Sequence, residues 1–193
     1  MAVIDSYIHD FIIIAIIHLI AVISPGPDFA LICRQGLIYG RKTSIWTSIG
    51  IGCGILVHIF YCIIGIAIII ENSIFLFTAI QVMGALYLFY LGVLSIKSSF
   101  SKLKVDISFD VEIISSYSAF SMGFLTNILN PKATLFFISL FSIVIKPTTA
   151  ISIQIFYGLW MSLITGLWFI FLSFFLTTEI ISKKIDKIGY IIE

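Results

Sequence analysis

Five long runs of apolar residues, almost free of charges, constrain this fold more than any other feature of the sequence. They cover positions 11–27 with an extension over 29–33, then 43–70, 72–96, 113–145 and 147–178. A helix needs about 20 predominantly apolar residues to cross the hydrocarbon core of a bilayer. We therefore predict about five transmembrane helices, with the lipid bilayer as the main environment of the chain.

Helices, and not strands, are expected in these runs, although Ile and Phe are abundant in them. Strands cross a membrane only as closed barrels, whose sequences alternate polar and apolar residues. The runs are apolar at odd and even positions alike and are too long for barrel strands. The chain is 60% apolar and 11% charged, against about 45–50% and about 25% in soluble domains. We predict an all-α, polytopic membrane helical bundle.

The basic residues between the runs predict the orientation of this bundle. Positions 34–42, 97–112 and 179–193 hold most of the Lys and Arg, while the alternate connections offer only Glu71 and Lys146 as charges. Short cytoplasmic loops carry an excess of Lys and Arg. We therefore expect the N-terminus outside, and the 97–112 loop and the C-terminal tail in the cytoplasm.

Two short segments break the apolar pattern with proline and a charge. Their residues are Ser24, Pro25, Gly26, Pro27 and Asp28 in the first break and Asn130, Pro131 and Lys132 in the second. Proline removes a backbone donor and breaks a helix, and glycine adds freedom at the same point. Broken backbone and charges are tolerated at membrane depth only where protein or a water-filled cavity satisfies them. The breaks therefore predict two discontinuous helices that face a polar cavity.

The two breaks share an apolar-polar-proline pattern, and the orientation above makes their helices run in opposite directions. Corresponding broken helices of opposite direction indicate an inverted-repeat transporter with its site at the repeat interface. We expect one transmembrane domain over 1–193, with a first repeat at about 8–96, a charged cytoplasmic loop at 97–112 and a second repeat at about 113–193.

Gly50, Gly54 and His58 follow one another at intervals of four residues, so they lie on one face of a helix. Small residues at this spacing favour close helix packing in membranes, which we expect to be the role of the two glycines. His58 would then be hydrogen-bonded at the packed face, with a proton relay as the alternative. His18, on an apolar face, is expected to be a satisfied interior histidine.

Together these motifs resemble those of the LysE/RhtB family of amino-acid exporters. The first part of the resemblance is the 24–28 segment, followed by Gly36, by 40–42 and by the pattern over 50–58. The second part is the segment 123–133, which reads GFLTNILNPKA. The resemblance extends from about position 10 to 175. It implies a secondary transporter that exports amino acids or related small zwitterions across the bacterial cytoplasmic membrane, driven by an ion gradient, with H⁺ as the expected coupling ion.

The resemblance also implies a sixth hydrophobic segment, which would complete the second repeat. None follows the run 147–178 in this sequence, so we expect an incomplete second repeat. A homodimer would complete the bundle. Otherwise the chain would be a transport-inactive remnant or a subunit of a larger membrane assembly.

The candidate residues for substrate binding or coupling are Ser24, Asp28, His58, Asn127, Asn130 and Lys132. Asp28 would bind a substrate ammonium or take part in proton coupling, or else cap the helix that resumes after the break. Lys132 would pair with a substrate carboxylate or with Asp28, or extend to the membrane interface. Asn127 and Asn130 would bind substrate through their amides or satisfy carbonyls freed by Pro131.

A membrane-embedded enzyme is the competing class of function. A metalloprotease of the usual kind needs an HExxH pair of histidines, and a thiol-redox carrier needs cysteines near the breaks. The sequence has no such histidine pair, and Cys33, Cys53 and Cys62 lie outside both breaks. We expect no catalytic residue, no metal and no cofactor, and the net charge of +1 gives no sign of a nucleic-acid partner.

Overall fold

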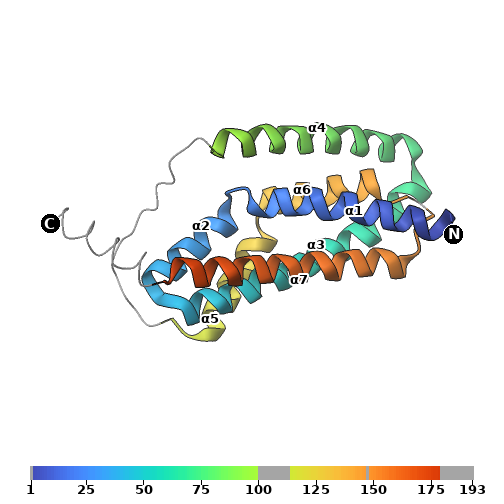
Figure 1. Ribbon diagram of the computed structural model, residues 1–193. Coiled ribbons are helices and arrows are strands. Elements are labelled where there is room, and N and C mark those ends of the chain that lie inside the picture. Colours follow the sequence, from blue (N-terminus) through green and yellow to red (C-terminus); the bar gives the residue numbers. More distant parts are fainter. Residues whose placement is uncertain (1, 100–113, 147, 179–193) are drawn as a thin grey trace.

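The computed structural model describes residues 2–99, 114–146 and 148–178, and helices make up nearly all of them (Figure 1). The helices are α1 (Ala2–Ile23), α2 (Pro27–Arg34), the π-helix η1 (Gln35–Tyr39), α3 (Gly40–Asn72), α4 (Ile74–Ser99), α5 (Ser116–Ile128), α6 (Pro131–Val144) and α7 (Ile151–Leu176). The described ranges contain no strand. The prediction of an all-α polytopic bundle is confirmed.

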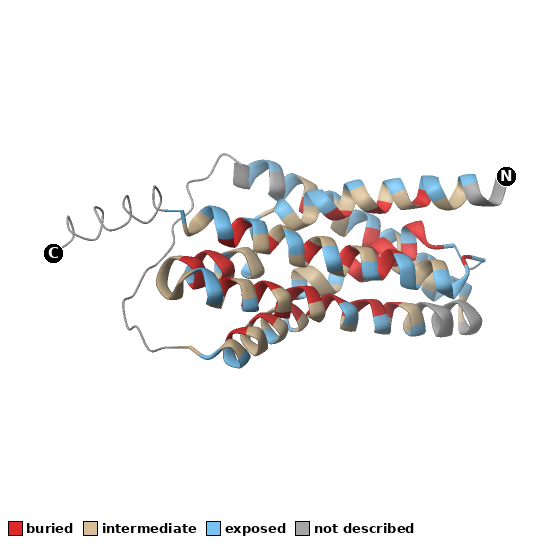
Figure 2. Ribbon diagram, turned by 60° about the horizontal axis from the view of Figure 1, so that its bottom comes forward, coloured by how far each residue is buried: buried red, intermediate tan, exposed pale blue. Residues whose placement is uncertain are grey.

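Four stretches of helix are long and apolar enough to cross a membrane. They are Asp5–Ile23, Pro27–Gly65, Ile74–Leu94 and Ile151–Leu176. The α5–α6 pair supplies a fifth candidate span, bent by 56° at its break. Large apolar side chains cover the outside of the bundle, as with Phe75 at 84% and Phe89 at 73% exposed, while buried residues line the inner helix faces (Figure 2). An apolar surface of this kind suits the hydrocarbon of a bilayer. The four or five candidate spans agree with the prediction of about five.

The helices that contain the first two predicted runs begin earlier than those runs. The first helix begins at Ala2 and includes Asp5 and Asp10, and α3 begins at Gly40, before the run at 43–70. A helix can carry a charge where the side chain is exposed, as Asp5 is, or paired, as Asp10 is with Lys146, so a charge does not mark a helix end. Between α2 and α3 the chain reverses at η1 and Gly40 (Figure 1). Gly40 has φ of 83°, which suits glycine.

Proline starts a helix at both breaks. At the first break α1 ends at Ile23, Gly26 is the extended N-cap residue of α2, and Pro27 follows at the first helical position. At the second, Asn130 is the N-cap of α6 and Pro131 follows it. The first N–H groups of a helix have no intrahelical partner, so proline loses nothing there. Helices α1 and α2 run toward one end of the bundle, and α5 and α6 run the opposite way (Figure 1).

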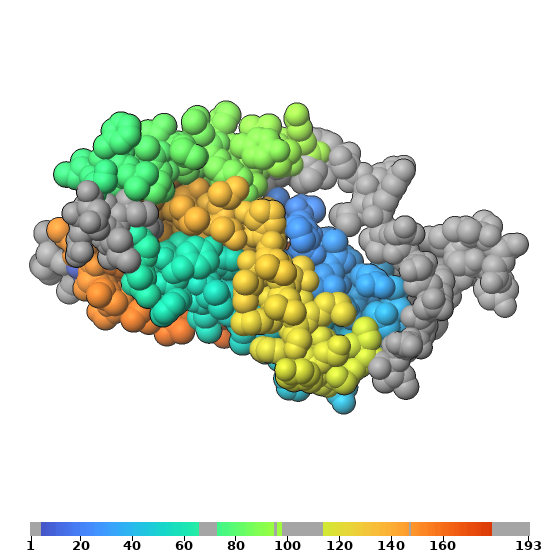
Figure 3. All heavy atoms as spheres, turned by 180° about the vertical axis from the view of Figure 1, so that it is seen from behind, coloured from blue at the N-terminus to red at the C-terminus, as the bar shows by residue number. Residues whose placement is uncertain are grey.

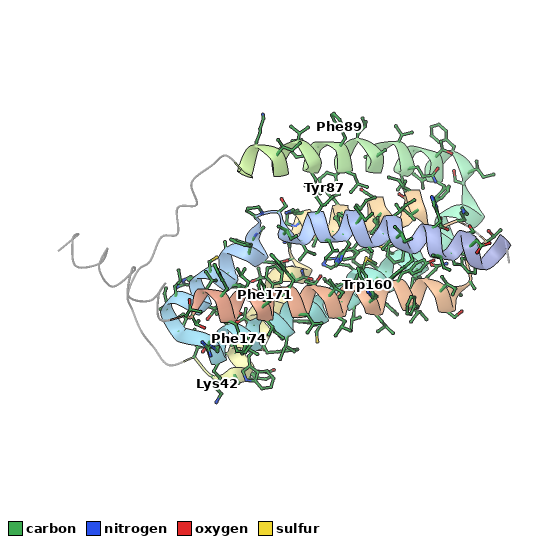
Figure 4. The ribbon with its side chains drawn as sticks, viewed as in Figure 1. Lys42, Tyr87, Phe89, Trp160, Phe171 and Phe174 are labelled. Atoms are coloured by element: carbon green, nitrogen blue, oxygen red, sulfur yellow. The ribbon has the colours of Figure 1, made fainter. Side chains whose placement is uncertain are left out.

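Charged residues lie at both ends of the helical bundle. Lys42 lies at the end of the bundle opposite the N-terminus (Figure 4), and α4 and α7 also end there (Figure 1). At the N-terminal end, Lys146 Nζ donates to Asp10 Oδ2 at 3.3 Å and to Ser6 Oγ at 3.0 Å. Most of the predicted loop at 97–112 and the whole tail at 179–193 lie outside the described residues. Which end faces the cytoplasm stays a prediction, as do the repeat boundaries.

Helix α3 is the centre of the bundle and packs against α5 and α7. Glycines set its distance from α5: a Cβ at Gly50 would overlap the carbonyl group of Phe120, and one at Gly123 would overlap that of Thr47. A Cβ at Gly54 would lie 2.7 Å from Asn127 Oδ1. Helix α4 lies along the side of the bundle and contacts mainly α6 (Figure 3). The close crossing of α3 and α5 brings the second break toward the centre of the molecule.

Candidate functional site

A cavity of about 60 Å³ lies where the two breaks meet, with room for a few water molecules. The residues of the breaks that line it are Ser24, Gly26, Asp28, Asn130 and Lys132, together with Asn127 near the end of α5. Its other polar residues are His18 and Thr165, and its apolar walls include Phe136, Phe137 and Phe169. The cavity therefore collects polar groups of helices that are far apart in the sequence.

Lys132 binds the broken end of α1. Its Nζ donates to the carbonyl oxygen of Ser24 at 2.9 Å and to those of Ala21 and Pro25 at 3.4 Å each. The last carbonyls of a helix have no intrahelical partner and carry partial negative charge, so an ammonium stabilises them. Among the described residues Lys132 and Asp28 form no ion pair within 4.0 Å, although both line the cavity. The lysine thus connects the second break to the first.

Asp28 keeps one carboxylate oxygen unpaired. Asn127 Nδ2 donates to Asp28 Oδ2 at 2.8 Å, whereas Oδ1 is buried without a hydrogen-bond partner among the described residues. The N-cap of α2 is Gly26 and has no side-chain hydrogen bond, so the carboxylate does not cap the resumed helix. It lies in the first turn of α2, where the helix dipole favours a negative charge. A buried acceptor without a donor is costly, which makes this oxygen a suitable partner for a bound ammonium.

Asn127 and Asn130 serve the second break as well as the cavity. The backbone oxygen of Asn127 accepts from Asn130 N at 3.0 Å, and Asn130 Oδ1 accepts from the backbone N of Lys132 at 3.0 Å as the cap of α6. Both asparagines are buried. The Asn127 amide therefore holds Asp28, and the Asn130 side chain caps an N–H group of the broken backbone and not a carbonyl. Substrate binding by the two amides stays a prediction.

His58 lies behind the cavity and does not line it. Its Nε2 is 3.1 Å from the backbone oxygen of Asn127, and its Nδ1 is 2.6 Å from Tyr61 Oη. Because the carbonyl can only accept, Nε2 carries the proton and Nδ1 accepts from the Tyr61 hydroxyl. The ring also stacks on Phe137, with centroids 5.4 Å apart. His58 is fully hydrogen-bonded and supports the end of α5.

Two polar cavity residues, His18 and Thr165, were not identified as site residues from the sequence. His18 is fully buried; its Nε2 is 3.1 Å from Thr165 Oγ1, and its Nδ1 has no hydrogen-bond partner among the described residues. The interior position agrees with the sequence interpretation, but the expected full hydrogen bonding does not. A histidine one to two turns before a helix break was the available signal, whereas Thr165 on α7 gave none.

Metal binding has no support in the described part of the chain. Residues 2–99, 114–146 and 148–178 contain no group of three or more His, Cys, Asp or Glu side chains placed to hold an ion. The polar groups of the cavity are one carboxylate, one ammonium, two amides, hydroxyls and an imidazole. This set suits a small molecule that carries both charges.

The sequence of this chain is similar to those of a known protein family. A family model described as LysE type translocator matches residues 19–192. The threonine efflux protein of Escherichia coli is 36% identical over 134 residues, which cover 69% of this chain and 65% of that protein. An uncharacterised membrane protein of Bacillus subtilis is 33% identical over 163 residues, covering 79% of this chain and 76% of its own length. The chain thus spans slightly less than two thirds of the length of the threonine efflux protein. No solved structure matches it.

Proposed function

Because this chain belongs to the LysE type translocator family, we propose that it is a secondary transporter that exports small amino acids across the bacterial cytoplasmic membrane. The similarity to threonine efflux proteins supports a small neutral amino acid as the substrate. The proposal includes the predicted orientation and H⁺ as the coupling ion, and it makes the protein a transporter and not an enzyme.

The observation that carries the proposal is the unpaired oxygen of Asp28 between the two broken helices. An amino acid presents an ammonium group, which needs acceptors, and a carboxylate, which needs donors. Asp28 Oδ1 would accept from the ammonium. The N-termini of α2 and α6 meet at the same cavity and offer N–H groups and positive dipole ends to a carboxylate. Both charges of the substrate would then be satisfied without water.

Alternating access would follow from movement of one broken helix pair against the other. The two pairs are held together at the cavity by few contacts, chiefly the Lys132 ammonium on the end of α1 and the Asn127 amide on Asp28. A substrate that replaces water there would compete for these same groups. Binding would therefore weaken the connection between the pairs, which gives a physical route from binding to opening.

Efflux from loaded cells tests the proposal directly. Cells that express the chain are expected to lose one or a few amino acids of a pooled set faster than cells with the empty vector. Collapse of the proton gradient should abolish the difference if H⁺ is the coupling ion. Equal losses with and without well-inserted protein would contradict the proposed function, and efflux that survives the collapse would contradict only the coupling ion.

Replacement of Lys132 by methionine is expected to lower the efflux rate by about tenfold or more. The change removes the ammonium that the carbonyls of Ser24, Ala21 and Pro25 accept from, and hydrogen bonds to a charged group contribute about 1.5–3 kcal/mol. Efflux rate per amount of membrane-inserted protein is the measurement. Lys42→Met is the control, since Lys42 is exposed at the end of the bundle opposite the N-terminus (Figure 4). Equal rates in the two variants would argue against a functional role for the lysine at the break.

A further inference from the structure

His18 lines the cavity with one ring nitrogen still unpaired. The side chain is 0% exposed, Thr165 Oγ1 lies 3.1 Å from Nε2, and Nδ1 has no hydrogen-bond partner among the described residues. The ring is surrounded by aromatic groups, with the centroid of Trp160 at 5.9 Å and that of Phe136 at 6.2 Å. A buried polar atom without a partner costs about 1–3 kcal/mol. A ligand group that hydrogen-bonds to Nδ1 would remove this cost and so bind more tightly.

The imidazole of His18 and the carboxylate of Asp28 line the same cavity but offer different hydrogen-bonding groups. Asp28 follows the break of α1 and provides a charged acceptor, while His18 lies six residues before Ser24, roughly 9 Å along the helix, and provides a neutral group. The walls include Phe136, Phe137 and Phe169. A small amino acid held by its ammonium at Asp28 would direct its side chain toward these remaining groups.

The state of the imidazole favours a hydroxyl group as its partner. If Nε2 donates to Thr165, Nδ1 is an acceptor; if Thr165 donates to Nε2, Nδ1 carries the proton and is a donor. A hydroxyl both donates and accepts, so it satisfies Nδ1 in either tautomer. A methyl group satisfies neither tautomer, and it would leave the nitrogen unpaired.

We propose that His18 and Thr165 form a subsite for a side-chain hydroxyl, which selects small hydroxylated amino acids over aliphatic ones of the same size. The inference rests on the proposed function and adds a specificity determinant to it. Sites that hydrogen-bond a substrate hydroxyl reject analogues without it strongly, because their own polar groups are left unpaired. Threonine and valine, which have nearly the same shape, are the appropriate pair of probes.

The test is the ratio of threonine to valine efflux in the whole chain reconstituted into liposomes. The wild-type ratio is expected to exceed 10. Thr165→Val, which keeps the shape of the side chain, and His18→Leu are each expected to lower the ratio at least fivefold. The control is His9→Leu, because the His9 side chain is 74% exposed, and its ratio should equal that of the wild type.

Three outcomes are distinguishable. A wild-type ratio near 1 would overturn the subsite and leave the export function standing. An unchanged ratio in Thr165→Val, or a parallel fall of both rates with normal insertion, would assign the pair a structural role and also overturn it. If no amino acid is exported by wild-type protein, the proposed function itself fails. Thermal stabilisation of purified wild-type protein by threonine but not by valine gives a second readout, which needs no variant to fold.

Discussion

Asp28→Asn is expected to insert into the membrane normally and to export its amino acid at least about 100-fold more slowly than the wild type. The amide has the shape of the carboxylate, and its oxygen can still accept the 2.8 Å hydrogen bond from Asn127 Nδ2. What it removes is the charge that would hold the substrate ammonium. Loss of one partner of a buried, hydrogen-bonded charge pair costs about 2–5 kcal/mol. The initial rate of efflux from preloaded cells, divided by the amount of inserted protein, is the measurement.

The matched control for this variant is Asp5→Asn. Asp5 is an exposed acidic residue in the first turn of α1 and lies far from the cavity along the helix. Its replacement removes the same charge but should leave the rate unchanged. Wild-type efflux in Asp28→Asn would mean that export does not need the charge of Asp28. The proposed function would then lose the observation that carries it.

The features of the fold that could be predicted from the sequence depend on local rules. A run of about 20 apolar residues has few alternatives to a membrane span, and a proline within such a run has few alternatives to a break. Both breaks occur where Pro27 and Pro131 predict them. Helix ends were less predictable, because charges such as those of Asp10 and Arg41 lie inside helices and find partners there, Lys146 and Thr177.

The partners of the site residues could not be predicted, because they depend on tertiary packing. Thr165 contacts His18 across 147 positions of sequence, and Lys132 contacts Ser24 across 108. The sequence suggested Asp28 as one partner of Lys132, since opposite charges attract, but it contains no local sign that the carbonyls at the end of α1 are nearer. Likewise, the role of His58 follows from the backbone of Asn127, which no pattern in the sequence connects to it.

The largest structural effect is expected from Gly123→Ala, which should destabilise the folded protein by more than about 3 kcal/mol. Overpacking a well-packed interior usually costs about 1–3 kcal/mol through shifts of side chains. Here the new Cβ would overlap the backbone carbonyl of Thr47, and a backbone carbonyl inside a helix has no rotamer by which to move away. Helix α5 would have to separate from α3. Asn127 lies one turn beyond Gly123 on α5, so the same shift would draw its amide away from Asp28.

Thermal unfolding of the purified protein in detergent, followed by monodispersity on gel filtration, measures this effect, and Gly92→Ala is the matched control. A Cβ at Gly92 would meet no atom within 4 Å, and alanine favours a helix over glycine by about 1 kcal/mol. The control should therefore unfold at the same temperature as the wild type or slightly higher, whereas Gly123→Ala should unfold well below it or aggregate. Since both changes add one methyl group to a helical glycine, only the closeness of the α3–α5 crossing separates them. Equal unfolding temperatures would mean that the two helices do not cross this closely, and the position of Asn127 beside Asp28 would lose its structural basis.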